Sequence, residues 1–422
     1  MTAPDTHQAI NAVFRIELPR LIAGIARIVR DIGVAEELAQ DALVKALETW
    51  PDAGVPDNPG AWLMATAKNR ALDLQRRARM LERKHQELGR QTDAQERALA
   101  AEGEAALDDD VGDDLLRLIF TSCHPLLTAE ARVALTLRLL GGLSTAEIAR
   151  AFLVSEPTIA QRIVRAKRTL SEARVPFEVP RGPELSTRLS SVLEVVYLIF
   201  NEGYAATAGD DWMRPSLCED ALRLGRILAA IAPDEPEVHG LVALMEIQAS
   251  RAAARTGPAG EPILLLDQNR GRWDQLMIHR GLAALARVEA LGGADGSYAL
   301  QAAIAACHAR ARAPEDTDWV RIAALYGVLA AQVPSPIVEL NRAVAVGMAF
   351  GPAAGLGLVD ALAATSTLDD YHLLPSVRAD LLMKLGRRDE AGAEWQRAAS
   401  LTQNVREQAL LLARAESCAR VG

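Results

Sequence analysis

The stretch "LSTAEIARAFLVSEPTIAQRIVRAKRTL", residues 143–170, limits the possible folds most, because it starts two helices in quick succession. Ser144 and Glu147 predict a capping box, in which each side chain accepts a hydrogen bond from the other residue's backbone N–H. Ser155 predicts a second N-cap, with Pro157 in the first turn of the next helix. Apolar residues then recur at the spacing of one buried helix face: Ile159, Ile163, Ala166 and Leu170. We therefore predict a helix-turn-helix.

The second predicted helix carries a polar, largely basic face opposite its apolar one. In a helix-turn-helix the second helix lies in the DNA major groove, with its N-terminal half on base edges. We therefore expect Gln161 and Arg165 to read bases. The other predicted DNA contacts of this segment, including those to phosphates, are Glu156, Thr158, Arg162, Lys167 and Arg168. The alternative is a basic face that only contacts solvent, and Leu153 stands where many such turns have glycine.

The composition favours helices throughout the chain of 422 residues and excludes a polycation. Hydrophobic residues make up 50% of it and aromatic residues only 4%, while Ala and Leu recur at helical spacing, which predicts an all-α fold. The formal net charge is −9. Any DNA binding therefore has to come from local basic surfaces, because phosphates must be neutralised at the contact.

Several classes of protein are not expected. The N-terminal "MTAPDTHQAI" lacks the pattern of a signal peptide, and no run of about 18 apolar residues predicts a membrane span. The four cysteines are too far apart for a zinc site or a disulfide framework, and we expect them to be buried: Cys123, Cys218, Cys307 and Cys418. We expect a cytoplasmic protein without a metal, a cofactor or an enzymatic activity of its own.

A second basic segment, "DNPGAWLMATAKNRALDLQRRARM", spans residues 57–80. Asn58 predicts an N-cap and Pro59 the first helical position. Upstream, residues 35–50 form an amphipathic pattern with Leu38 and Ala42 on the apolar face. Its predicted polar face carries Glu36, Glu37, Gln40, Asp41 and Lys45. Taken alone, the basic segment is equally consistent with a solvated helix end.

The order of these segments resembles bacterial sigma factors of the extracytoplasmic-function group. Residues 35–50 and 57–80 resemble sigma region 2, in which an acidic helix precedes a helix with a characteristic set of positions. Here that set is Trp62, Leu63, Ala67, Asn69 and Asp73, followed by Arg76, Arg77 and Arg79. The helix-turn-helix resembles sigma region 4, including its "RAKRTL" end. The resemblance covers roughly residues 10–174.

The resemblance implies that the chain binds core RNA polymerase and directs it to promoters. Region 4 would bind the −35 element as duplex, and region 2 would open the −10 element and hold a single strand, with the loop of residues 51–58 shaping a base pocket. The implied region 2 contacts to DNA are Asn58, Asn69, Arg70, Asp73, Arg76 and Arg77. The implied contacts to polymerase are Glu37, Leu38, Gln40, Asp41 and Lys45. The implied partner surfaces are the beta-prime clamp helices and the beta flap.

The predicted domains are residues 1–91 for region 2, an acidic linker over 92–112, region 4 over 113–175, and a long helical region over 184–422. The linker is either a flexible tether or a chain that threads the polymerase channel later used by RNA. In the last region, "YHLLPSVRADLLMKLGRRDEAGAEWQRAASL" resembles a tetratricopeptide repeat. We expect this helical repeat to regulate the sigma activity, and a regulatory protein is a candidate partner for it.

Two motifs of the C-terminal region have open interpretations. "FNEGY" at Phe200 and "GRWDQ" at Gly271 contain carboxylates near aromatic residues. They indicate either polar ties between helices or a small-ligand pocket. Two rival functions remain as well: a one-component helix-turn-helix regulator that senses a ligand or a protein, and a repeat scaffold that gathers proteins.

Overall fold

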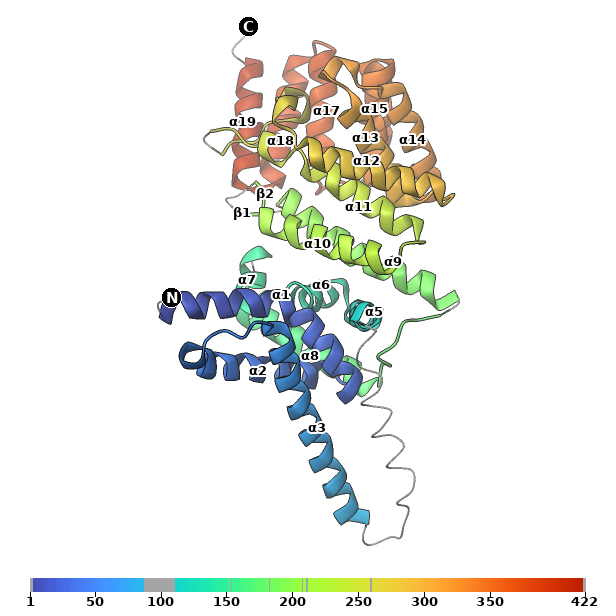
Figure 1. The fold of residues 1–422 in the computed structure, drawn as a ribbon. Coiled ribbons are helices and arrows are strands. Elements are labelled where there is room, and N and C mark those ends of the chain that lie inside the picture. Colours follow the sequence, from blue (N-terminus) through green and yellow to red (C-terminus); the bar gives the residue numbers. More distant parts are fainter. Residues whose placement is uncertain are drawn as a thin grey trace. The chain divides into compact units, whose positions relative to one another are not determined.

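The computed structural model describes residues 3–86, 111–152, 154–181, 183–206, 208–209, 212–258 and 260–419. The predicted linker lies almost wholly outside these residues, as does Leu153. The described chain is helical almost throughout, as the sequence predicts (Figure 1). It divides into two compact units, residues 1–196 and 197–422.

The first unit contains seven described helices and the start of an eighth. They are α1 (Ala3–Val29), α2 (Ile32–Ala53), α3 (Pro59–Gln86), α5 (Val111–Ser122), α6 (Ala129–Leu139), α7 (Thr145–Ala151), α8 (Glu156–Glu172) and α9 (Pro183–Tyr204). Helices α1, α2 and α3 pack on one another. Their contact faces are rich in alanine, such as Ala39, Ala42 and Ala67, and these small buried side chains allow close approach of the helices.

Helices α5 to α8 form a second cluster, which packs on the first through contacts of α1 with α5 and α6. The start of α9 belongs to this cluster. Its Arg188 donates to the carbonyl of Phe120 at 2.8 Å, and its Ser191 donates to the carbonyl of Cys123 at 2.6 Å. These bonds satisfy carbonyls at the end of α5, which have no partner within their own helix. The boundary between the two units along the chain therefore falls within α9, between Val196 and Tyr197.

The second unit continues from the end of α9 through a series of helices. They are α10 (Pro215–Ile231), α11 (Pro236–Ala249), α12 (Gln275–Ala290), α13 (Ser297–Arg310), α14 (Trp319–Gln332), α15 (Pro336–Phe350), α16 (Pro352–Ala363), α17 (Leu373–Lys384), α18 (Arg388–Leu401) and α19 (Val405–Ala419). Short 3-10 turns are η1 (Ala252–Ala254), η2 (Leu265–Asp267), η3 (Arg270–Arg272) and η4 (Pro314–Asp316). The two-residue strands β1 (Ala208–Gly209) and β2 (Gln403–Asn404) pair in parallel.

From α13 onward each helix of the second unit packs against the next one along the chain (Figure 1). The predicted repeat falls on α17 and α18, which are joined by a turn at Gly386 with φ +78°. Ala391, Trp395 and Ala398 of α18 are buried in the core that links α15 to α19. Packing of each helix on its neighbour along the chain also occurs in helical-repeat proteins.

The motif "LLLDQNRGRWD" ties this unit together. The Arg270 guanidinium donates to the carbonyl of Ala311 at 2.7 Å and to that of His308, so it caps the end of α13. Asp274 caps α12 by accepting from the backbone N–H of Met277 at 3.0 Å. Trp273 is buried in a small cluster with Ile278 of α12, against which Ala309 of α13 packs. Arg270 precedes the "GRWDQ" motif, but within the motif the Asp274 backbone N–H donates to the carbonyl of Ser250, at the end of α11, at 2.8 Å, so the motif ties α12 to α11.

One residue of the "FNEGY" motif also forms a polar contact between helices. Glu202 forms an ion pair with Arg214. A side chain at Gly203 would lie 2.7 Å from the backbone nitrogen of Cys218, so this close approach requires glycine. None of the helices in the described chain combines the length and apolarity needed to cross a membrane.

Candidate nucleic-acid interface

The helix-turn-helix forms with the predicted caps. The Ser144 backbone N–H donates to Glu147 Oε2 at 2.7 Å, and the Glu147 N–H donates to Ser144 Oγ at 3.2 Å. Ser155 caps α8 by accepting from the Thr158 N–H at 3.3 Å. The capping box and the second cap are thus confirmed. Both are local interactions, which is why the spacing of a few residues predicts them.

Helix α8 has one buried and one outward face. The four predicted apolar positions, Ile159, Ile163, Ala166 and Leu170, are all buried. Gln161, Arg165 and Arg168 lie on the opposite side of the helix and are exposed. Arg168 donates to Glu172 at 2.6 Å, and this carboxylate raises the pKa of its guanidinium. Gln161 and Arg165 thus form an outward polar surface with the chemistry needed to read base edges.

The flanks of this surface differ. Thr158 and Arg162 are half-buried at its edge, and Glu156 accepts a hydrogen bond from Thr145 at 3.1 Å. Lys167 lies on the other flank, where it forms an ion pair with Glu36 of α2. The structure therefore brings Lys167 to a junction inside the first unit, away from the outward face of α8.

Glu36 is the centre of that junction, and its side chain is only 3% exposed. Oε1 accepts from Arg138 of α6 at 2.7 Å and from Gln40 at 2.8 Å, while Oε2 faces Lys167. We expected Glu36 on the polar face of its helix, and this was wrong. It lies beside the alanine stripe of α2 and is covered where α6 and α8 approach.

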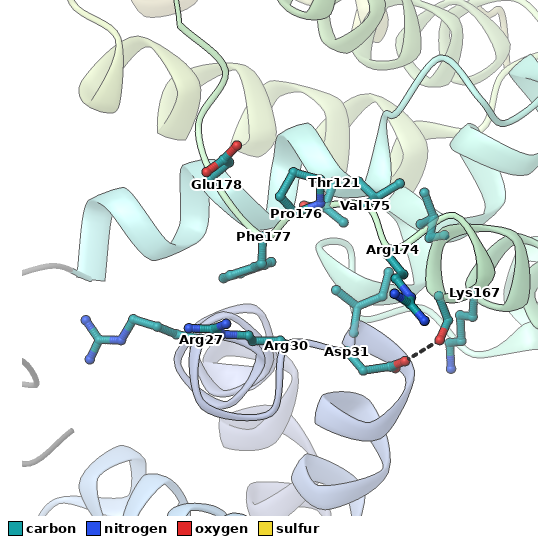
Figure 2. A pocket seen from close by; sticks show the side chains of 13 residues that line it. Arg27, Arg30, Asp31, Thr121, Lys167, Arg174, Val175, Pro176, Phe177 and Glu178 are labelled. Atoms are coloured by element: carbon teal, nitrogen blue, oxygen red, sulfur yellow. Dashed lines mark hydrogen bonds between the residues drawn. The ribbon is translucent and has the colours of Figure 1, made fainter. Parts of the chain in front are cut away.

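The same junction contains a pocket of about 680 Å³ (Figure 2). Arg27, Arg30 and Asp31 from the end of α1 and the following turn face Arg174 and Phe177, which follow α8. Ser171 donates to Asp31 Oδ2 at 2.8 Å, while Asp31 Oδ1 caps α2. One carboxylate thus both starts α2 and binds α8.

Helix α3 presents its basic residues to solvent. Asn58 caps it by accepting from the Ala61 N–H at 3.1 Å. The exposed predicted contacts are Asn69, Arg70, Asp73, Arg76 and Arg77. Leu63, Ala67 and Ala71 are buried and form an apolar stripe on α3, whereas Leu74 is 46% exposed and lies outside that stripe. These polar side chains therefore lie along one accessible surface of α3.

Helix α2 holds the residues predicted to contact polymerase. Glu37, Asp41 and Lys45 are exposed and Gln40 is half-buried, but Leu38 is buried. Asp41 forms an ion pair with Arg70 of α3. The predicted polymerase surface and the predicted single-strand surface are therefore adjacent.

The loop between α2 and α3 is shorter than expected. We predicted a loop over residues 51–58, but α2 continues through Pro51 to Ala53. It ends at Gly54, with φ +85°, whose N–H donates to the carbonyl of Trp50 at 2.9 Å. Pro51 therefore lies in the last turn of α2, and the loop proper spans residues 54–58.

Nothing among the described side chains forms a metal-binding cluster. All four cysteines are unpaired and buried, as predicted. Burial raises the pKa of the Cys123 thiol to about 11, which keeps it neutral and unreactive. Burial, with a contribution from Arg188, lowers the pKa of the neighbouring His124 to about 4.

Comparison with known proteins assigns families to these segments. Residues 13–80 match the family described as Sigma-70 region 2, and residues 117–170 match Sigma-70, region 4. Residues 188–289 match a family of unknown function (DUF6596). An uncharacterized protein of Rhizobium meliloti (strain 1021) is 41% identical over 394 residues, which cover 93% of this chain and 92% of that relative. No solved structure matches the chain significantly.

The two sigma-70 regions coincide with the two outward basic surfaces of the first unit, those of α3 and α8. Sigma-70 regions of these two kinds act in promoter recognition together with core RNA polymerase. The chain therefore belongs to the sigma-70 family and has a promoter-recognition role.

Proposed function

We propose that the chain is an alternative sigma factor of the extracytoplasmic-function type, with a tetratricopeptide-like C-terminal domain that modulates its activity. The observation that supports this most is the presence of both sigma-70 regions in one chain, each with an accessible basic helix. The chain would supply promoter choice and strand opening, while polymerase supplies the chemistry of RNA synthesis.

In this proposal α8 reads the −35 element in the major groove. Gln161 and Arg165 lie outward near the start and middle of the helix, where base edges are contacted. Arg162 and Arg168 bind the flanking phosphates, and Glu156 and Thr158 contact DNA at the helix start. Bidentate contacts of this kind between arginine and guanine contribute about 1–3 kcal/mol of discrimination each.

Helix α3 and the loop of residues 54–58 open the −10 element in the same proposal. Unstacking a base costs a few kcal/mol, and a shaped pocket beside a basic surface offsets that cost. Asn58 and Asn69 offer amide groups to an unpaired base, beside Asp73. Arg70, Arg76 and Arg77 offer charge to the strand's phosphates.

Lys167 reaches a phosphate only if regions 2 and 4 separate. The resemblance to sigma factors implies promoter elements about 17 base pairs apart, or roughly 55–60 Å along the duplex. In the structure, α2 and α8 touch through Glu36 and Lys167. We therefore propose that binding to polymerase opens this junction and releases Lys167 toward DNA.

The test of the main proposal is transcription by core polymerase on a library of genomic fragments, with sequencing of RNA 5′ ends. The full chain should produce starts at a defined set of sites that share spaced −35 and −10 sequences. Core polymerase alone should not produce them. Absence of any specific start with active core enzyme contradicts the proposal, and tight duplex binding without polymerase favours the one-component regulator instead.

The proposed modulation is tested by a second arm of that assay, with a chain that ends after Ala206. This chain retains the whole of α9, including the residues that cap α5. Modulation predicts a changed amount of promoter-specific RNA at equal protein concentration. Unchanged output from a folded shortened chain, checked by circular dichroism, contradicts it.

The polymerase contacts are tested by reversing one charge on α2. Asp41→Arg should abolish co-elution with core polymerase, because it places a cation beside Arg70 in the proposed docking surface. Asp52→Arg, an exposed position at the end of α2, is the matched control and should leave co-elution intact. Normal co-elution of a folded Asp41→Arg protein removes this docking assignment.

A further inference from the structure

The second unit contains a cavity of about 630 Å³ on one side of its helical array. Its walls come from α9, α11, α13, α14 and α15 and from the start of α17. Cavities of this size hold small molecules in many proteins. All its lining residues lie within residues 197–373, so the cavity belongs to the second unit alone.

The charged groups of the lining are of one sign, positive. Arg251, which follows α11, is the only lining side chain that is always ionised, and no carboxylate lines the cavity. Arg251 is 7% exposed and has no ion-pair partner among the described residues, and its Nε has no hydrogen-bond acceptor there. Its guanidinium lies 5.7 Å from the Tyr204 ring and 5.9 Å from the Trp273 ring.

Burying such a group without an anion is costly. Burial removes the hydration of the ion, and contacts with aromatic faces recover only part of that loss. Other arginines of this unit show the ordinary solutions: Arg214 pairs with Glu202, and Arg270 is bound by backbone carbonyls. Arg255 also contacts the Tyr204 ring, at 3.5 Å, but it does not line the cavity.

Two further polar atoms of the lining are buried without a hydrogen-bond partner among the described residues. They are Gln248 Oε1 and His308 Nδ1. Burial, together with the positive charges of Arg251 and Arg270, lowers the pKa of His308 to about 4, so the ring is neutral near pH 7. Buried polar groups are nearly always hydrogen-bonded, so three such atoms at one cavity indicate a site built for a polar ligand.

The remaining wall is aromatic and apolar. Tyr197, Tyr204, Tyr326 and Tyr371 line the cavity beside Phe200 and several aliphatic side chains. Burial raises the pKa of Tyr326 to about 12, so its hydroxyl stays neutral and available as a donor. The wall therefore combines a flat apolar surface with hydroxyl donors around one buried cation.

We propose that this cavity binds a small organic anion, whose carboxylate or phosphate pairs with Arg251 and whose apolar or aromatic body packs on the tyrosines. A cationic ligand would be repelled by Arg251, the one charge of the lining that is always present. A neutral apolar ligand would leave Arg251 and the two unpartnered atoms as they are. An anion satisfies the guanidinium with charge-assisted hydrogen bonds, which are stronger than neutral ones.

The proposal concerns binding, and it stands whether or not the C-terminal domain modulates transcription. The experiment is isothermal calorimetry on the full chain with four probes: benzoate, phenyl phosphate, benzyl alcohol and benzylamine. The two anions should bind, and the neutral and cationic probes should bind at least about tenfold more weakly, because only the anions pair with the guanidinium.

The variant that isolates the contact is Arg251→Met, which keeps the apolar bulk and removes the charge. It should weaken binding of the two anions by at least about tenfold. Arg280→Met, on the exposed surface of α12, is the matched control and should bind them like the original protein. If Arg251→Met does not fold, Arg251→Lys serves instead, and it should bind the anions more weakly while still preferring them to benzylamine.

Three results overturn the proposal. The first is that neither anion binds the folded full chain. The second is that benzyl alcohol or benzylamine binds as tightly as the anions. The third is that both anions bind the Arg251 variant with unchanged affinity, which places any binding elsewhere on the protein.

Discussion

Glu36 in the first unit and Arg251 in the second are both buried ionised side chains, but their surroundings are opposite. Glu36 is 3% exposed and receives Arg138, Lys167 and Gln40. Arg251 is 7% exposed and faces a cavity whose lining contains no carboxylate. Since burial of an ion is costly unless a partner offsets the cost, the two sites must serve different purposes.

The groups that surround the two charges differ in kind. Around Glu36, the partners come from α6 and α8, so the carboxylate ties two helices to α2. Around Arg251, no described carboxylate forms an ion pair with the guanidinium, which instead lies near the rings of Tyr204 and Trp273. Removal of the first charge should cost stability, whereas removal of the second should cost only ligand binding.

The largest expected effect comes from removing the structural charge. Glu36→Ala should lower the free energy of unfolding by about 3 kcal/mol, because it leaves Arg138 and Lys167 facing a buried site without their anion. Glu37→Ala, one position along and exposed, should change it by less than about 0.5 kcal/mol. Urea unfolding followed by circular dichroism measures both. Similar small changes in unfolding free energy at the two positions would contradict a structural role for Glu36.

The next effect comes from removing a charge that faces outward from α8. Arg165→Ala should weaken promoter use by about 1–3 kcal/mol, the value of one good base contact, without changing the unfolding free energy. Arg280→Ala, exposed on α12, is the control. Promoter-specific RNA in the polymerase assay is the readout. Undiminished RNA from the Arg165 variant removes this residue from the reading surface.

The third prediction uses pH to examine the positive surroundings of His308. The unfolded imidazole takes up its proton near pH 6.5, but the folded one does so only at about pH 4. The unfolded state therefore gains the proton first, so stability is complete above pH 6.5 and falls as pH is lowered toward 4. Between pH 6.5 and 5 the loss from this group should be about 1–2 kcal/mol.

Urea unfolding at several pH values measures that loss, and His308→Gln should reduce it. His279→Gln, at an exposed position, is the control and should leave the pH profile unchanged. Because Arg251 contributes to the lowered pKa of His308, Arg251→Met should also make the profile shallower. A profile that neither His308→Gln nor Arg251→Met alters contradicts this coupling.

The smallest expected effect is opposite in sign to the first. Arg251→Met should leave the unfolding free energy unchanged or raise it by about 1 kcal/mol, since it removes a buried charge that has no counter-ion in the described chain. Thermal and urea unfolding without added anions measure this effect. A loss of 2 kcal/mol or more would show that Arg251 is a structural group like Glu36.

Local patterns predicted the helix-turn-helix well. The caps at Ser144 and Ser155 and the buried stripe of α8 depend on residues three or four positions apart, so they are visible in the sequence. The end of α2 was less predictable. The resemblance to sigma region 2 implied a loop over residues 51–58, but α2 continues to Ala53, where Trp50 packs against Trp62 of α3 with ring centroids 5.3 Å apart.

Contacts between distant segments were not predictable. Glu36 reads as one more polar residue of an acidic helix, and only the approach of α6 and α8, more than a hundred positions later, buries it. The signal that could have been noticed is its place beside the alanine stripe of α2. The sequence also could not choose between the two interpretations of the "FNEGY" motif. In the structure Glu202 forms an ion pair with Arg214, while Phe200 and Tyr204 line the cavity.

By itself, the sequence determined the helical fold class, the two sigma-70 segments and the caps that start α3 and α8, because these depend on periodicity and on hydrogen bonds between near neighbours. Only the tertiary structure decided which charges are neutralised inside the protein and which are left to face a cavity. That choice depends on what distant helices bring within a few ångströms of each charge, and burial makes its consequences large.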